Sequence, residues 1–252
     1  MRIEEQVGII CISRGEKLNA LSWEMMQQLD ACFEELDRSR EIRAVILHSD
    51  FPRAFGVGAD IGDWGSLEPL EMWRHWTRHG HRILRNLEEL IHPVIAVING
   101  LTFGGSLELA LAADIRIAET GTQLGFPEAR VGTIPGWHGT RKALELIGPS
   151  RLKKMIFTGQ PIAVGEAREI GLIDHETPAG QGLQYARELA AQMCETSPVS
   201  ASLAKQVINS LASGNPATAL ESISSGLAAQ TEDGREGRES FAAKRKPEFT
   251  GF

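Results

Sequence analysis

Short runs of apolar residues alternate with amphipathic segments over the first half of the chain. The runs have the length and β-branched content of strands, at Val7–Ile12, Ala44–His48, Val94–Ile98 and Ile115–Ala118. The segments between them have helical spacing, at Trp23–Arg38, Leu70–Leu90 and Ser106–Ala113. Because buried strands that alternate with helices are typical of parallel sheets, the pattern predicts an α/β fold.

Beyond Thr140 the pattern becomes helical. "TRKALELIG" predicts a helix with Thr140 as N-cap and Gly148 past its end. Further helices, each closed by Gly, Pro or Ser, are expected in "SRLKKMIFTG", "AVGEAREIGL", Gln181–Cys194 and Pro198–Leu211. We therefore predict a core domain over residues 1–195 and a helical region of the same unit over residues 196–252.

Composition narrows the class of protein. The 252 residues are 42% hydrophobic and 23% charged, which is ordinary for a globular protein, and the net charge of -7 argues against a nucleic-acid binder. This net charge does not exclude a small anionic ligand that is bound by a local basic patch. The three cysteines are far apart and predict reduced thiols. With neither a leader peptide nor a membrane-length apolar run in view, we expect a soluble cytoplasmic protein with no membrane partner.

A glycine-rich stretch, "RAFGVGADIGDW" at residues 53–64, follows the second apolar run. A dinucleotide-binding loop would need a third glycine where Ile61 stands, followed by an unbroken helix, and "GDWGSLEPL" is interrupted by Gly and Pro. A plain structural turn is the other interpretation of this stretch taken alone.

A second glycine loop, with Gly104 and Gly105, precedes a helix that is expected to begin near Ser106. Free backbone N–H groups at such a helix start favour negative charge. Acids follow at Glu108 and, in another Gly-Pro-rich loop, at Glu128. Taken singly, Glu108 in a first helical turn would complement the helix dipole and Glu128 would be a solvated loop acid. Together they form a candidate acid–base pair.

These motifs carry a resemblance. "AFGVGADI", "FGGSLELALAADIRIA", "FPEARVGTIPGWHGT", "KLNALS", "SPVSASLAKQVIN" and "EGRESFAAKRKPEFTGF" resemble, in order, segments of the enoyl-CoA hydratase (crotonase) family over nearly the full chain. The resemblance implies a crotonase (ClpP/crotonase-like) fold, a spiral of ββα units with a C-terminal helical trimerisation region. It also implies a homo-oligomer, a trimer or a dimer of trimers.

The resemblance assigns roles in adding water across the 2,3-double bond of an enoyl-CoA. The N–H groups of Ala59 and Gly105 would form an oxyanion hole for the thioester oxygen. Glu108 and Glu128 would be the catalytic acid and base, and the Gly136 N–H would help to hold the water. Neither a metal nor a redox cofactor is implied, because coenzyme A enters as part of the substrate. Substrate-binding positions would be Lys17, Leu18, Ala20, Ala59, Asp60, Ile61, Gly62, Gly105, Phe241 and Lys244.

The chain departs from the family pattern at several positions. Ser106 replaces a third loop glycine, Phe126 stands where Gln is usual, and His138 beside Trp137 stands where Gly is usual. His138 is either a third titratable group at the site or a helix-capping residue packed on Trp137. The alternatives for function are an acyl-CoA isomerase or hydrolase that uses Glu128 alone, and a non-catalytic RNA-binding homologue.

The segment between the two glycine loops is rich in Trp and His. Its tryptophans would limit the depth of the acyl site or belong to the core. His75 and His79 are four residues apart on the predicted helix, but no acid completes a metal-ligand set nearby, so no metal site is predicted.

Overall fold

The computed structural model describes residues 1–251 and contains a six-stranded sheet in the order β1-β2-β3-β5-β7-β10. All neighbouring strands are parallel except β1 and β2. The strands are β1 (Arg2–Glu4), β2 (Val7–Ile12), β3 (Ala44–Ser49), β5 (Val94–Ile98), β7 (Ile115–Glu119) and β10 (His175–Thr177). The four predicted strands are confirmed, two of them one residue longer than expected.

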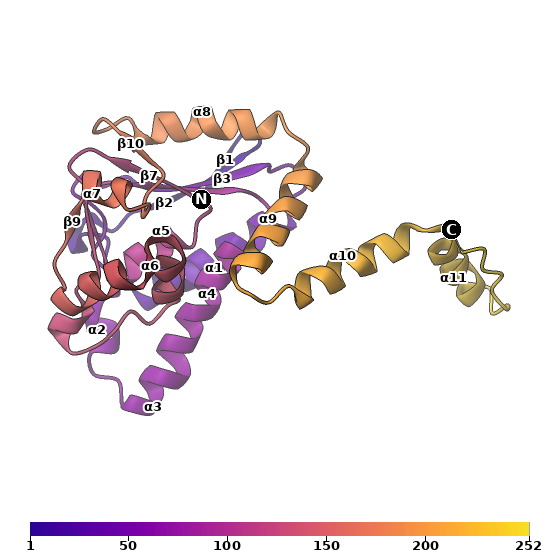
Figure 1. The fold of residues 1–252 in the computed structure, drawn as a ribbon, viewed down its shortest axis with the longest axis horizontal. Helices are drawn as coiled ribbons and strands as arrows, with labels where there is room; N and C mark the ends of the chain where they lie inside the picture. Colours follow the sequence, from indigo (N-terminus) through magenta and orange to yellow (C-terminus); the bar gives the residue numbers. More distant parts are fainter. Residues whose placement is uncertain (252) are drawn as a thin grey trace. The chain divides into compact units, whose positions relative to one another are not determined.

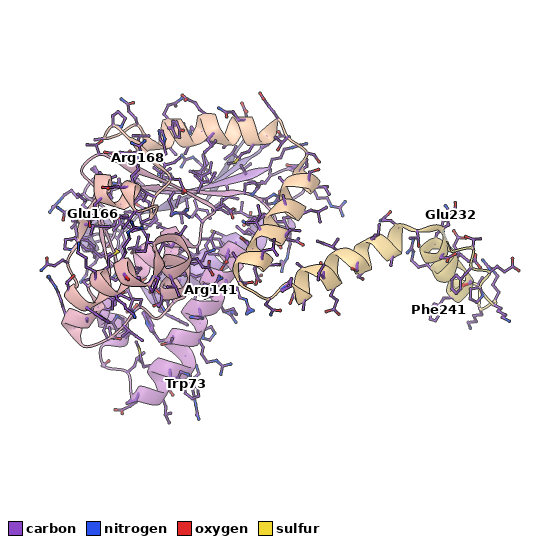
Figure 2. All side chains as sticks on the ribbon, in the orientation of Figure 1. Trp73, Arg141, Glu166, Arg168, Glu232 and Phe241 are labelled. Atoms are coloured by element: carbon purple, nitrogen blue, oxygen red, sulfur yellow. The ribbon has the colours of Figure 1, made fainter. Side chains whose placement is uncertain are left out.

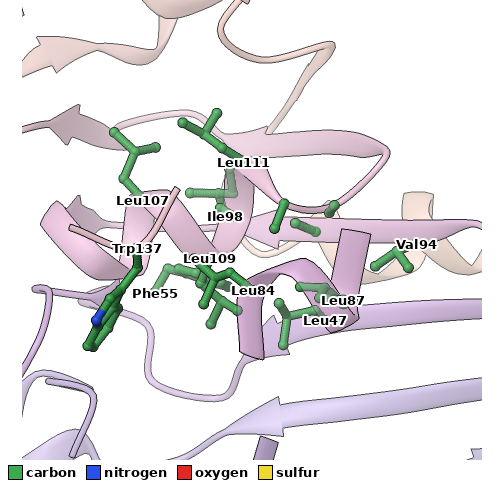
Figure 3. Close-up of a cluster of buried hydrophobic side chains, with 14 of the residues drawn as sticks. Leu47, Phe55, Leu84, Leu87, Val94, Ile98, Leu107, Leu109, Leu111 and Trp137 are labelled. Carbon is green, nitrogen blue, oxygen red and sulfur yellow. The ribbon is translucent and has the colours of Figure 1, made fainter. Parts of the chain in front are cut away.

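This sheet is covered on both faces, as Figure 1 shows, with α8 on one side and α1, α4 and α5 on the other. Alternate side chains of β3 divide between the two faces, Ala44 and Ile46 toward α8 and Val45 and Leu47 toward the larger core. Figure 3 shows part of that larger core. Burial on both faces explains why these strands read as unbroken apolar runs.

Two of the helices that accompany this sheet, α1 and α8, were predicted almost to the residue. Their bounds are α1 (Trp23–Arg38), α2 (Ile61–Trp64), α3 (Pro69–Glu71), α4 (Arg78–Glu88), α5 (Gly104–Leu111), α6 (Gly139–Thr158), α7 (Val164–Glu169) and α8 (Gly182–Cys194). The expected helix over residues 70–90 is observed as α3, a π-helical turn η2 (Met72–Thr77) and α4 in direct succession. Short 3₁₀ turns occupy η1 (Gly15–Lys17) and η3 (Glu128–Val131).

A second, four-stranded sheet was not predicted. It has the order β4-β6-β8-β9, with bounds β4 (Ala54–Gly56), β6 (Leu101–Phe103), β8 (Gln123–Gly125) and β9 (Ile162–Ala163). Its first three strands are parallel, and each leads directly into a glycine- or proline-rich segment that carries candidate site residues. Because the carboxyl ends of parallel strands share one edge, this small sheet brings the three segments together.

Two predicted helix starts are wrong. Helix α5 begins at Gly104 rather than near Ser106, so Glu108 lies beyond the first turn and is not placed to complement the helix dipole. Helix α6 is capped by His138 rather than Thr140, and His138 has the left-handed φ of 93°. Gly148 does interrupt the helix, with a φ of 73°, as predicted.

The chain divides into two compact units, Met1–Pro198 and a second that begins at Val199. The second unit is helical, with α9 (Pro198–Ala212), α10 (Ala217–Gln230) and α11 (Glu232–Ala242). It carries exposed apolar side chains, Val207, Ile208, Leu211, Leu220 and Leu227. The homo-oligomer and the cytoplasmic location stay predictions. Over residues 1–251, none of the helices has the length and apolar character that crossing a bilayer requires.

Candidate active site

In the first glycine loop, the backbone N–H of Ala59 makes no hydrogen bond to the neighbouring segment at Leu21. Leu21 and Ala59 form an isolated parallel bridge, in which Leu21 N donates to Gly58 O at 2.7 Å and Asp60 N donates to Leu21 O at 2.9 Å. The bridge therefore uses the groups on either side of Ala59 N–H. The loop is anchored through its flanking residues while that donor stays available.

The second glycine loop supplies a matching donor. Gly105 is the second residue of α5, where N–H groups have no acceptor within the helix, and the N-cap Phe103 provides no side-chain acceptor. A Cβ on Gly105 would lie 3.4 Å from Ala59 N, so the two peptide segments are in contact. Two N–H groups from different loops thus meet at the start of a helix, where the helix dipole favours negative charge.

Ser106 ties these two loops together, a function that the sequence did not reveal. Its buried Oγ accepts a hydrogen bond from Gly58 N at 3.1 Å. A Cβ on Gly56 would lie 2.3 Å from this Oγ, so glycine is required there for the contact. The residue that departs from the family's third glycine therefore fixes the position of the segment that holds Ala59.

Glu108 reaches from α5 to the loop that precedes α6. Its Oε1 accepts backbone N–H bonds from Trp137 and Gly139, each at 2.8 Å. Burial raises the pKa of Glu108, while the amides of Gly139, Trp137 and Gly136 and the nearby His138 act to lower it. The fit is close, because a Cβ on Gly139 would lie 2.3 Å from Glu108 Cγ. The carboxyl is thus fixed in position by donors that favour its ionised form.

Glu128 opens η3 after Pro127 and lacks such donors. Its Oε1 lies 3.0 Å from the position of a Cβ on Gly104, beside the second glycine loop. Its Oε2 is buried and has no hydrogen-bond partner among residues 1–251. Burial raises the pKa of Glu128 to about 7, its own backbone N–H opposes the rise, and the charge of Glu108 adds to it. Glu128 is therefore half-buried and coupled to Glu108, not a solvated loop acid.

The remaining predicted positions fall into four groups. Lys17, Leu18 and Ala20 lie in and after η1, on the approach to the bridge at Leu21. Asp60 pairs with Arg14 at 2.6 Å and accepts the Gly62 N–H at 2.9 Å, so it also caps α2.

The other two groups are exposed or belong to the second unit. Ile61 and Gly62 are exposed in α2. Phe241, labelled in Figure 2, and Lys244 lie at the end of α11 in the second unit, and their contact with substrate stays a prediction.

The tryptophans divide between core and surface. Trp76 and Trp137 are buried, with ring centroids 5.3 Å apart, and Trp23 continues the stack at 5.6 Å from Trp76. Trp137, labelled in Figure 3, also packs against the second glycine loop. Its Cζ3 would lie 2.7 Å from a Cβ added to Gly105. Trp73 is 58% exposed (Figure 2).

The histidines near the stack have other partners. His75 pairs with Glu71 at 3.4 Å. The ring of His79 packs edge-on against Trp23. Among residues 1–251, no cluster of three or more His, Cys, Asp or Glu side chains is arranged to hold a metal ion.

A buried acid beside this site was also missed. Glu88, at the end of α4, has a side chain only 8% exposed and contacts His138, Arg141 and Lys142. A signal was present, because Glu88 is four residues after the buried Leu84 and so lies on the apolar face of the helix. Arg14, the partner of Asp60, carried no comparable signal.

The two glycine loops thus bring two carboxyls and two backbone N–H groups together on an α/β scaffold. The sequence model of the enoyl-CoA hydratase/isomerase family matches residues 2–251, and the chain belongs to that family. The predicted family and crotonase-type α/β fold are thereby confirmed, as is the prediction of a hydratase-type enzyme at the level of the family.

The relatives cover nearly the whole chain. A short-chain-enoyl-CoA hydratase of Clostridium acetobutylicum is 35% identical over 247 residues, which is 97% of this chain and 94% of the relative. The mitochondrial methylglutaconyl-CoA hydratase of Mus musculus is 32% identical, over 98% of this chain and 81% of the relative. Among solved structures, the enoyl-CoA hydratase of Bacillus anthracis is 31% identical, with a TM-score of 0.82 over 100% of this chain and 98% of that chain.

Proposed function

We propose that the chain is an enoyl-CoA hydratase, in which Glu108 and Glu128 act together and Ala59 and Gly105 stabilise the reacting thioester. The observation that carries the proposal is the coupling of a buried and a half-buried carboxyl in unlike environments beside two uncommitted N–H groups. Family membership alone does not select hydration, because one scaffold can support several chemistries.

The two environments assign separate roles. Glu108 receives two backbone N–H bonds that favour its ionised form, so we assign it the role of base. Glu128, with a pKa of about 7, is protonated in a large fraction of molecules at neutral pH, so we assign it the role of acid. Two neighbouring carboxyls whose environments differ in this way are the usual arrangement for paired acid and base functions.

The proposed step conserves atoms and charge. The oxygen of water bonds to C3 of the enoyl group while the carboxylate of Glu108 takes a proton from that water. The C2=C3 electron pair moves toward the thioester oxygen, and C2 then receives the proton of Glu128. Proton transfer from Glu108 back to Glu128 restores both groups. No electron leaves the substrate, so this reaction needs no redox cofactor, and the donors at Ala59 and Gly105 would replace a metal as the stabiliser of the oxyanion.

Each backbone donor is expected to matter greatly. Removing one oxyanion-hole donor typically costs about 10²–10³ in kcat. Structures with a bound acyl-CoA should therefore show the thioester oxygen about 2.7–3.1 Å from both N atoms. A thioester that points elsewhere would contradict the assignment.

Kinetics of matched variants test the acid–base roles. Glu108→Gln and Glu128→Gln should each lower kcat by at least about 10²-fold, with acyl-CoA affinity changed only a few-fold. Glu169→Gln, at an exposed position in α7, is the matched control and should leave kcat unchanged. A panel of enoyl-CoA thioesters, followed by loss of the conjugated double bond and detection of 3-hydroxyacyl-CoA, identifies the reaction.

The outcomes separate the alternatives. Isomeric enoyl-CoA as product, with activity that survives Glu108→Gln, would indicate an isomerase that uses Glu128 alone. Release of the free CoA thiol would indicate a hydrolase. Tight RNA binding without turnover would favour the non-catalytic homologue.

A further inference from the structure

A buried ionic cluster lies beside the loop that holds Glu108, and no step of the proposed reaction uses it. Glu88 of α4 is its anion. Both of its carboxylate oxygens accept from Arg141 Nη2, at 2.6 and 2.7 Å, and Oε1 also accepts from Lys142 Nζ at 2.9 Å. Burial opposes ionisation, but the contacts with His138 and Arg141 and the charge of Lys142 hold the pKa of Glu88 well below its ordinary value. The cluster is thus charged and fixed.

His138 connects this cluster to the site. Its Nε2 lies 3.3 Å from Glu88 Oε2 and accepts from Arg141 Nε at 2.6 Å, and its ring meets His81 edge-on at 5.0 Å. The side chain is only 17% exposed, so both the ring and its partners are held in place.

The backbone of His138 is strained, and its side chain is held by neighbours. A φ of 93° is rarely adopted by residues other than glycine and costs about 1–3 kcal/mol. Immediately on either side, Trp137 N and Gly139 N make the 2.8 Å bonds to Glu108 Oε1. The direction of those two N–H groups depends on the backbone dihedrals of the residue between them.

We propose that His138, anchored by Arg141 and through it by Glu88, is a positioning residue that holds the Trp137 and Gly139 amides on Glu108. The proposal rests on the proposed hydratase function, in which Glu108 is the base. It explains why a strained histidine stands at a position that glycine would fill without strain. The charged and titratable groups that face His138 are His81 and Glu88 from α4, Arg141 and Lys142 from α6, and Glu108 from α5.

His138→Gly separates positioning from folding. Glycine adopts φ 93° without penalty, so stability should hold or rise, while the amides lose their anchor. We expect kcat to fall about tenfold with KM within about twofold, since small misplacements of catalytic groups have effects of this order or larger. The acid limb of the pH–rate profile should move to higher pH, because the donors and the nearby His138 both lower the pKa of Glu108. A merely structural role would not produce lower kcat, unchanged Tm and a displaced limb together.

Two further variants sharpen the test. His138→Gln retains an acceptor for Arg141, so it should recover most of the lost kcat. Glu5→Gly is the matched control, because Glu5 also has a positive φ, 53°, but lies in an exposed turn between β1 and β2, and it should change neither kcat nor the pH profile.

Different results would contradict the positioning role of His138 and the proposed hydratase function. Normal turnover and a normal pH profile for His138→Gly, beside an active wild type, would overturn the positioning role alone. A wild type that hydrates none of the enoyl-CoA thioesters would overturn the proposed function and the positioning role with it.

Discussion

Replacing Gly105 by alanine tests how closely the donor loop is packed. Gly105 is helical and has no positive φ, so its backbone accepts a side chain. The obstacle is Trp137, whose Cζ3 and Cε3 would lie 2.7 and 2.8 Å from the new methyl carbon. Glycine is therefore required at this position by lack of space, and the ring that excludes a side chain also belongs to the loop that holds Glu108.

The size of the effect follows from these distances. An ordinary contact begins at 3.4 Å, so ring and methyl must separate by about 0.7 Å, the difference between 3.4 and 2.7 Å. Trp137 has little freedom, being 2% exposed with its Nε1 against Gly80. Overpacking of this kind costs about 1–3 kcal/mol. If Gly105 moves instead, its N–H leaves the thioester oxygen, and kcat falls by about 10²–10³.

We expect Gly105→Ala to lower kcat about 10²-fold, with KM changed less than about threefold, and to lower Tm by about 2–4 °C per kcal/mol of strain. Steady-state hydration kinetics and thermal unfolding measure both. Gly165→Ala is the matched control, because nothing lies within 4 Å of its Cβ position. Trp137→Phe in the Gly105→Ala background should restore part of the kcat. Wild-type kcat and Tm for Gly105→Ala would refute the packing and the donor assignment together.

Two further predictions concern stability. Ser106→Ala should cost about 1–3 kcal/mol in urea unfolding, because the buried Gly58 N–H loses its acceptor, whereas Ser225→Ala at an exposed position should cost almost nothing. Because burial raises the pKa of Glu128 from 4.5 to about 7, the folded state binds the extra proton and wild-type stability falls as pH rises between those values. Glu128→Gln should therefore gain up to about 3 kcal/mol over wild type at pH 8 and nothing at pH 4, and equal differences at both pH values would contradict the raised pKa.

Strands and helices that are determined by the local sequence pattern could be predicted from the sequence. The strands of the larger sheet are buried on both faces, so their apolar runs predict them almost to the residue. The strands β4, β6 and β8 have only three residues each, too few for any periodicity to show, and the smaller sheet was missed. The glycine loops and both glutamates were found through motifs, although the start of α5 was placed two residues late.

The supporting residues depend on contacts between distant segments. Ser106 Oγ accepts a hydrogen bond from Gly58 N, 48 residues away, and Glu88 accepts one from Arg141, 53 residues away. Glu88 and Glu89 are adjacent and chemically identical, yet their side chains are 8% and 65% exposed. Helical phase distinguishes the two, but only the folded structure supplies the cations that make the buried one tolerable.

Which glutamate acts as base and which acts as acid depends on which of them accepts hydrogen bonds from the loop amides. Burial raises the pKa of both carboxyls, and only Glu108 receives loop amides, which favour its ionised form. If Glu128 received equal donors, it would lose its proton at neutral pH and the α-carbon would have no acid. The proposed reaction therefore needs the amides on one carboxyl only. In the proposed arrangement the backbone around His138 directs these amides to Glu108, and the strain at this residue is the cost of keeping acid and base distinct.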